Sequence, residues 1–129
     1  MWTEGLQDSI IAADSIFKMH LSQKNRIALI LLDSSLEIGY KEYLVNEINI
    51  GMQKFAGIAQ NRTDVQREVF KHITVTSGVE KQINHFYRLR NDLVHQRATP
   101  NVSDADIIQY RKIVESLLRK MVGLKFNVV

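Results

Sequence analysis

The residues best suited to chemistry lie in one short stretch, Arg90-Asn91-Asp92-Leu93-Val94-His95. Arginine carries a permanent planar charge that suits phosphate oxygens, and histidine exchanges protons near neutral pH. Together, the Arg90 and His95 side chains suit cleavage of a phosphodiester without a metal ion. The stretch ends an amphipathic segment, so we expect a helix to position these side chains.

The spacing of Arg90 and His95 does not favour a site on one helix. Five residues of a straight helix rotate a side chain by roughly 140° and advance it by about 7.5 Å. A two-fold axis, however, would bring the same patch of two subunits to one cleft. We therefore expect a homodimer in which each subunit contributes half of the site.

The chemistry expected of such a site is cleavage of single-stranded RNA. Attack of the 2′-hydroxyl on phosphorus needs a base, an acid for the leaving oxygen, and positive charge on the phosphoryl oxygens. His95 would be the base in one subunit and the acid in the other, and Arg90 would stabilise the phosphorane. Asn91 would bind a phosphate oxygen or orient His95. DNA lacks the attacking hydroxyl, which predicts RNA as the substrate.

Length and composition predict one domain spanning residues 1–129. The 129-residue chain is 45% hydrophobic, which is enough for one core. It has no cysteine, which excludes a disulfide framework and a thiolate metal site and fits a reducing compartment. The start lacks the pattern of a signal peptide, and the longest apolar run, 27–32, is far shorter than the roughly 20 residues of a membrane span. We expect a cytoplasmic protein that does not enter a membrane.

The apolar periodicity predicts an all-α fold, a bundle of four to five antiparallel helices. One proline and six glycines leave few helix breakers. Gly51 and Gly57 each weaken a helix by about 1 kcal/mol, so the third predicted segment should be short or kinked. The clear helical segments are predicted at 6–21, 25–44, 79–94 and 107–121, with a looser helical pattern at 45–59 and a short helix at 65–73.

The segment 25–44 is apolar over much of its circumference and should lie at the centre, with a stripe through Ile27, Leu31, Ser34 and Ile38. Other residues predict helix ends. They are Thr63 with Gln66, Ser77 with Glu80, Ser103 before Asp104 and Asp106, and Gly123 as a helix terminator.

Positive charge gathers in the second half of the chain. Residues 1–64 carry six Lys/Arg and eight Asp/Glu, whereas residues 65–129 carry eleven and six. This asymmetry favours a polyanionic partner, although solvation of helix faces explains it equally well. Lys81, Arg88 and Arg97 are the candidates to guide an RNA backbone, with ordinary surface charge as the alternative. Phe86 and Tyr87 fit core or dimer contacts better than base-stacking platforms.

Other kinds of site lack support in the sequence. His20, His72 and His85 are widely spaced and form no ligand pattern, so we expect no metal and no cofactor. No glycine-rich loop precedes a Lys-Ser/Thr pair, which excludes a P-loop. No serine lies in a nucleophile elbow, which argues against acyl transfer.

The Arg90-Asn91-x-x-x-His95 pattern at the end of a long helix resembles the signature of the HEPN (higher eukaryote and prokaryote nucleotide-binding) family. The resemblance implies an all-α bundle that dimerises through the motif helices. In many members it also implies metal-independent endoribonuclease activity in toxin systems, phage defence or RNA processing. An antitoxin or a larger defence protein is then a possible partner. Some relatives carry a tyrosine two residues after the histidine, where this chain has Arg97, so modification by a nucleotidyltransferase partner is not expected.

Two other functions remain open at this point. The same basic cleft would also suit a noncatalytic module that binds a nucleotide or RNA. Alternatively, the domain serves only oligomerisation, with Arg90 and His95 at the subunit contact. The simplest interpretation of both residues is local, because positive side chains near a helix C-terminus interact favourably with its last carbonyl groups.

Overall fold

The computed structural model describes residues 3–18, 24–95 and 101–123, and all regular elements in these ranges are helical. This confirms the all-α prediction. In none of the described helices do length and apolar character suffice for a membrane crossing. The elements are α1 (Thr3–Lys18), α2 (Lys24–Glu42), the π-helix η1 (Tyr43–Ile48), α3 (Met52–Ile58), α4 (Arg62–Val69), α5 (Ser77–His95) and α6 (Asp104–Val122).

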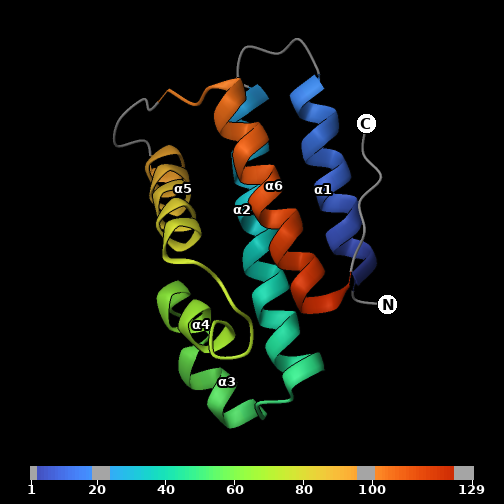
Figure 1. The fold of residues 1–129 in the computed structure, drawn as a ribbon, viewed down its shortest axis with the longest axis vertical. Helices are drawn as coiled ribbons and strands as arrows, with labels where there is room; N and C mark the ends of the chain where they lie inside the picture. The colour runs from blue at the N-terminus through green and yellow to red at the C-terminus, as the bar shows by residue number, and fades with distance from the viewer. Residues whose placement is uncertain (1–2, 19–23, 96–100, 124–129) are drawn as a thin grey trace.

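The helix α2 lies at the centre, as its apolar composition predicted. It contacts α1, α4, α5, α6 and η1. The four long helices alternate in direction, with α1 and α5 running opposite to α2 and α6 (Figure 1). The short helices α3 and α4 pack together near the C-terminal end of α2. This arrangement leaves α5, which carries the predicted motif, antiparallel to the central helix.

The buried face of α2 differs from the stripe that the sequence predicted. Ile27 and Ile38 are 39% and 49% exposed, whereas Leu32, Leu36 and Tyr40 are almost fully buried. The helix is apolar on several sides, so the periodicity alone did not identify the inward face. Gly39 marks the inward face of α2, because a Cβ there would lie only 2.6 Å from Leu118 Cδ2 of α6.

Aromatic packing joins α5 to α6. The Phe86 and Tyr110 rings stack with centroids 4.5 Å apart, and both residues are buried. Phe86 is therefore a core residue, as its place in the apolar stripe predicted.

The end signals around α6 were predicted correctly. Ser103 Oγ accepts from the Asp106 amide, and the Asp106 carboxylate accepts from the Ser103 amide, which completes a capping box. Gly123 ends the helix with φ 69°, a conformation that favours glycine.

The predicted N-terminal caps of α4 and α5, Thr63 and Ser77, were placed two residues and one residue too late. Asn61 caps α4, because its side chain accepts from the Asp64 amide, so the helix begins before Thr63. Thr76 Oγ1 accepts from the Val79 amide at 3.2 Å, so α5 begins at Ser77 itself. Several adjacent side chains are suited to capping, and local backbone conformation selects among them.

The segment 45–59 is interrupted at Gly51, as predicted, whereas Gly57 lies within the regular helix α3 and does not interrupt it. The π-helix η1 ends at Asn49, which has φ 58°, and Gly51 precedes α3 with φ 89°. Gly51 therefore permits a turn that other residues disfavour. Within α3 no residue is buried, so this short helix lies on the surface.

Candidate functional site

The motif residues lie in the last two turns of α5. Arg90 and Asn91 are partly buried, and His95, the last residue of the helix, is exposed. Arg90 Nη1 donates to Asn91 Oδ1 at 3.1 Å. The Arg-Asn pair of the motif is therefore a structural unit in which the amide oxygen orients the guanidinium.

A buried carboxylate lies behind Arg90. Asp33, in the middle of α2, is fully buried, and its Oδ2 lies 3.6 Å from Arg90 Nε. Arg90 Nε is itself buried and forms no hydrogen bond within the described part of the chain. The contact is thus an electrostatic attraction without a hydrogen bond.

Asp33 accepts its hydrogen bonds from other residues. Arg62 Nη1 and Nη2 donate to its two carboxylate oxygens at 3.2 and 3.1 Å, in the fork geometry typical of arginine. The Tyr110 hydroxyl donates to Asp33 Oδ1 at 2.5 Å. Four helices therefore meet at one carboxylate, and we call Asp33, Arg62, Arg90 and Tyr110 the charge cluster.

The protonation states within the charge cluster follow from burial and charge. Burial alone would lower the pKa of the Arg62 guanidinium, but the charge and hydrogen bonds of Asp33 outweigh it and raise that pKa. Burial raises the pKa of Tyr110, and the negative charge of Asp33 raises it further. Arg62 is therefore a permanent cation and Tyr110 a neutral donor at physiological pH.

The charge cluster leaves Arg90 only partly neutralised. The bidentate Arg62 already balances the charge of Asp33. The neighbouring acid, Glu37, pairs with Arg62 at 3.4 Å and with Lys41 at 3.7 Å. The Arg90 side chain remains 24% exposed. Its guanidinium is held in place from behind and keeps charge for an anion on the outer side.

The structure does not join His95 to the other motif residues. Among the described residues, no hydrogen bond or ion pair connects His95 with Arg90 or Asn91. Asn91 uses its oxygen on Arg90, so an orienting contact between Asn91 and His95 of the same chain is not observed. The five-residue offset on α5 turns Arg90 and His95 to different sides of the helix, whereas Asn91 and His95 are four residues apart and share a face without a hydrogen bond between them. The site within one chain is therefore incomplete.

The predicted RNA-guiding residues have different surroundings. Lys81 and Arg88 are exposed on α5. Arg88 lines a groove between α4 and α5, together with Tyr87. Arg97 lies outside the described residues.

Sequence reasoning missed Asp33, Arg62 and Tyr110. One signal was present, because Asp33 directly follows the longest apolar run of the expected central helix, where an acid needs a partner. Its partners are 29 and 77 residues away in the sequence, so the pairing itself could not be derived from local spacing.

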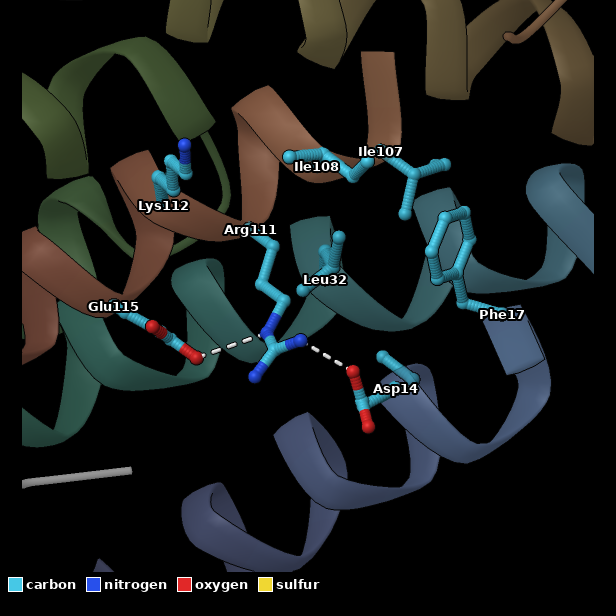
Figure 2. A pocket seen from close by; sticks show the side chains of 9 residues that line it. Asp14, Phe17, Leu32, Ile107, Ile108, Arg111, Lys112 and Glu115 are labelled. Atoms are coloured by element: carbon cyan, nitrogen blue, oxygen red, sulfur yellow. Dashed lines mark hydrogen bonds and ion pairs between the residues drawn. The ribbon is translucent and has the colours of Figure 1, made fainter. Parts of the chain in front are cut away.

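A separate cavity of about 200 Å³ lies between α1 and α6 (Figure 2). Its lining includes Phe17, Leu32 and Ile107. Arg111 extends between Asp14 of α1 and Glu115 of α6 and forms an ion pair with each (Figure 2). No residue of α5 lines this cavity, so it is separate from the motif.

No three His, Asp or Glu side chains within the described ranges gather in a way that would hold a metal ion. Comparison of the chain with models of protein families, with curated proteins and with solved structures gave no match.

Proposed function

We propose that this protein is a metal-independent endoribonuclease of the HEPN type that cleaves single-stranded RNA at a site shared by two subunits. One observation carries the proposal. Arg90 is fixed by Asn91 and attracted by Asp33, yet Arg62 and Tyr110 already occupy the oxygens of that carboxylate. An arginine that is oriented but not neutralised is suited to the charge of a phosphorane.

The reaction would proceed by attack of the 2′-hydroxyl oxygen on the adjacent phosphorus. His95 of one subunit accepts the hydroxyl proton as the new O2′–P bond forms. The P–O5′ bond breaks, and the partner subunit's His95 donates a proton to the leaving oxygen. The products are a 2′,3′-cyclic phosphate and a 5′-hydroxyl. Because Asn91 Oδ1 accepts from Arg90, its Nδ2 group remains as a donor for a phosphate oxygen.

Exposed apolar side chains near the motif support the homodimer. Val94, next to His95, is 48% exposed, and Ile27 on α2 is 39% exposed. The contact between Arg90 and Asp33 gives a common starting point on α5 and α2, which run antiparallel. His95 lies about 7.5 Å beyond Arg90 towards the C-terminus of α5, and Ile27 lies about 9 Å from Asp33 towards the N-terminus of α2. Both side chains are therefore near the same end of the bundle, where a second subunit would cover them.

The decisive experiment compares the wild-type protein with His95→Ala on end-labelled single-stranded RNA in the presence of a chelator. We expect the wild type to produce cyclic phosphate ends and His95→Ala to lose at least a hundredfold in rate, since general acid–base catalysis contributes about 10²–10⁴-fold. His85→Ala is the matched control, because His85 is also exposed on α5. An RNA with one 2′-deoxy position should resist cleavage at that position.

Other outcomes would replace the proposal. Equal rates for the wild type and His95→Ala would refute catalysis by His95. RNA binding without cleavage by the wild type would favour the noncatalytic binding module. Dissociation of the His95→Ala dimer, measured by light scattering, would favour the oligomerisation domain. A role in a toxin or phage-defence system, with an antitoxin or larger defence protein as partner, follows from the family resemblance and depends on the first outcome.

A further inference from the structure

A groove of about 650 Å³ lies between α4 and α5 and shares no lining residue with the α1–α6 cavity. Its lining combines cationic, aromatic and amide side chains. They include Gln66, Arg67, Phe70, Asn84, Tyr87 and Arg88.

The groove has an excess of positive charge. Arg67, Lys71 and Arg88 line it, against the single carboxylate of Glu80. Arg67 pairs with the exposed Asp64 of α4, and exposed pairs of this kind are weak in water. Lys71 pairs with the buried Glu68, but the Lys71 side chain is itself 59% exposed. Arg88 forms no ion pair with another described residue. Arg67 and Arg88 can therefore exchange their present partners or water for phosphate oxygens, and the exposed Lys71 ammonium can bind a phosphate oxygen beside Glu68.

The aromatic and amide groups of the groove are held in place from beneath. The Arg62 guanidinium lies 4.4 Å from the centroid of the Tyr87 ring. The Tyr40 hydroxyl donates to Gln66 Oε1 at 3.1 Å, and Gln66 Nε2 donates to Asn84 Oδ1 at 3.0 Å. This chain of hydrogen bonds fixes the Asn84 amide and leaves its Nδ2 group without an acceptor in the described residues. A fixed ring and a fixed amide donor suit the face and the edge of a nucleobase.

One face of α5 leads from the groove to the motif. Asn84, Tyr87 and Asn91 follow one another at steps of three and four residues, so they share a face of the helix. Asn91 lies about 6 Å beyond Tyr87 along the axis, which is close to the spacing of neighbouring nucleotides in an extended strand. Arg62 also links the two regions, because it contacts both the Tyr87 ring and the carboxylate behind Arg90.

We propose that the α4–α5 groove is the RNA-binding site, with Arg67, Lys71 and Arg88 on the phosphates and Tyr87 and Asn84 on a base. The inference rests on the proposed function for the identity of the strand as RNA. It adds residues of α4 to the site and predicts that the strand leads from this groove to Asn91 and His95 of the same subunit.

The test measures binding separately from cleavage. A fluorescent single-stranded RNA is titrated with His95→Ala protein by anisotropy at several salt concentrations. In this background, Arg67→Gln/Arg88→Gln removes two cations from the groove. The matched control, Lys18→Gln/Arg119→Gln, removes two exposed cations from α1 and α6. A third variant, Tyr87→Leu, removes the ring without changing charge, and circular dichroism verifies that every variant is folded.

We expect the double variant Arg67→Gln/Arg88→Gln, the groove pair, to weaken RNA binding about tenfold. It should also reduce the slope of log K against log salt concentration by about 1.4, since each lost phosphate contact contributes about 0.7 for a single strand. Tyr87→Leu should weaken binding about tenfold without changing the slope, because base stacking is not ionic. The control pair should bind as tightly as the background protein.

The possible failures of the two proposals can be distinguished. Equal binding by the groove pair and the control pair overturns the groove assignment, even if the wild type cleaves RNA. Failure of the background protein to bind RNA also overturns it. Binding that depends on the groove, in a wild type that does not cleave RNA, supports the groove and refutes the nuclease.

Discussion

Replacing Asp33 with asparagine tests whether the charge cluster holds the fold and the motif together. The substitution Asp33→Asn preserves the size of the side chain and removes its charge. Arg62, whose side chain is only 5% exposed, then has no charged partner except the more distant and more exposed Glu37. One bond survives, because an asparagine oxygen can still accept from the Tyr110 hydroxyl.

The expected loss of stability is large for one substitution. Removing one partner of a buried ion pair typically costs 3–5 kcal/mol, and the surviving Tyr110 bond places Asp33→Asn near the lower end, at about 3 kcal/mol. The matched control is Asp64→Asn, where an acid 40% exposed pairs with Arg67 at 3.0 Å. An exposed pair contributes at most about 1 kcal/mol.

Urea unfolding of both variants and the wild type, followed by circular dichroism, measures these differences. The double variant Asp33→Asn/Arg62→Met should be more stable than Asp33→Asn alone, because it no longer buries an unpaired cation. A loss below about 1 kcal/mol for Asp33→Asn, matching that of Asp64→Asn, would refute the proposed balance of charges. RNA cleavage by Asp33→Asn should also fall, since Arg90 loses the carboxylate that orients it.

Four further substitutions test contributions to stability. Gly57→Ala should stabilise the protein by about 0.5–1 kcal/mol in urea unfolding, because open space surrounds that helical position. Gly39→Ala should instead destabilise it by about 1–2 kcal/mol, because the added Cβ would overlap Leu118. Ser103→Ala should cost about 1 kcal/mol by the same measurement, since it removes the cap of α6. Burial opposes ionisation of Glu68, but hydrogen bonds from Lys71 and Lys54 outweigh it and lower the pKa of the carboxyl below its ordinary value. The stability that Glu68 contributes is therefore present above that ordinary pKa and is lost as pH falls through the lower, folded value. Glu68→Gln should therefore reduce the acid dependence of the urea midpoint, and an unchanged dependence would contradict this assignment.

The helices were predictable because they follow local rules. Apolar spacing identified the elements, and Gly51 correctly predicted an interrupted segment, whereas Gly57 lies inside α3. The inward face of α2 was not predictable, since a helix that is apolar on several sides has no unique stripe. The structure resolves this choice by the close approach of Leu118 to Gly39, a contact between residues far apart in the sequence.

In the candidate site, too, local contacts were predictable from the sequence and contacts between helices were not. Arg90 and Asn91 are neighbours in the sequence, and their hydrogen bond needs only a helix. The surroundings of Arg90 depend on Asp33, Arg62 and Tyr110, which come from three other helices. Periodicity places side chains on faces, but tertiary packing decides which charged faces meet.

The shortness of α4 has a consequence for the motif. Eight residues are too few for a helix to persist alone in water, and Arg62, its first residue, attaches it to the bundle. Arg62 and Arg90 compete for one carboxylate, so any event that detaches α4 frees Asp33 to form a full salt bridge with Arg90. The Arg90 guanidinium would then move inward towards Asp33. Docking of α4 would therefore control how much positive charge is exposed at the end of α5.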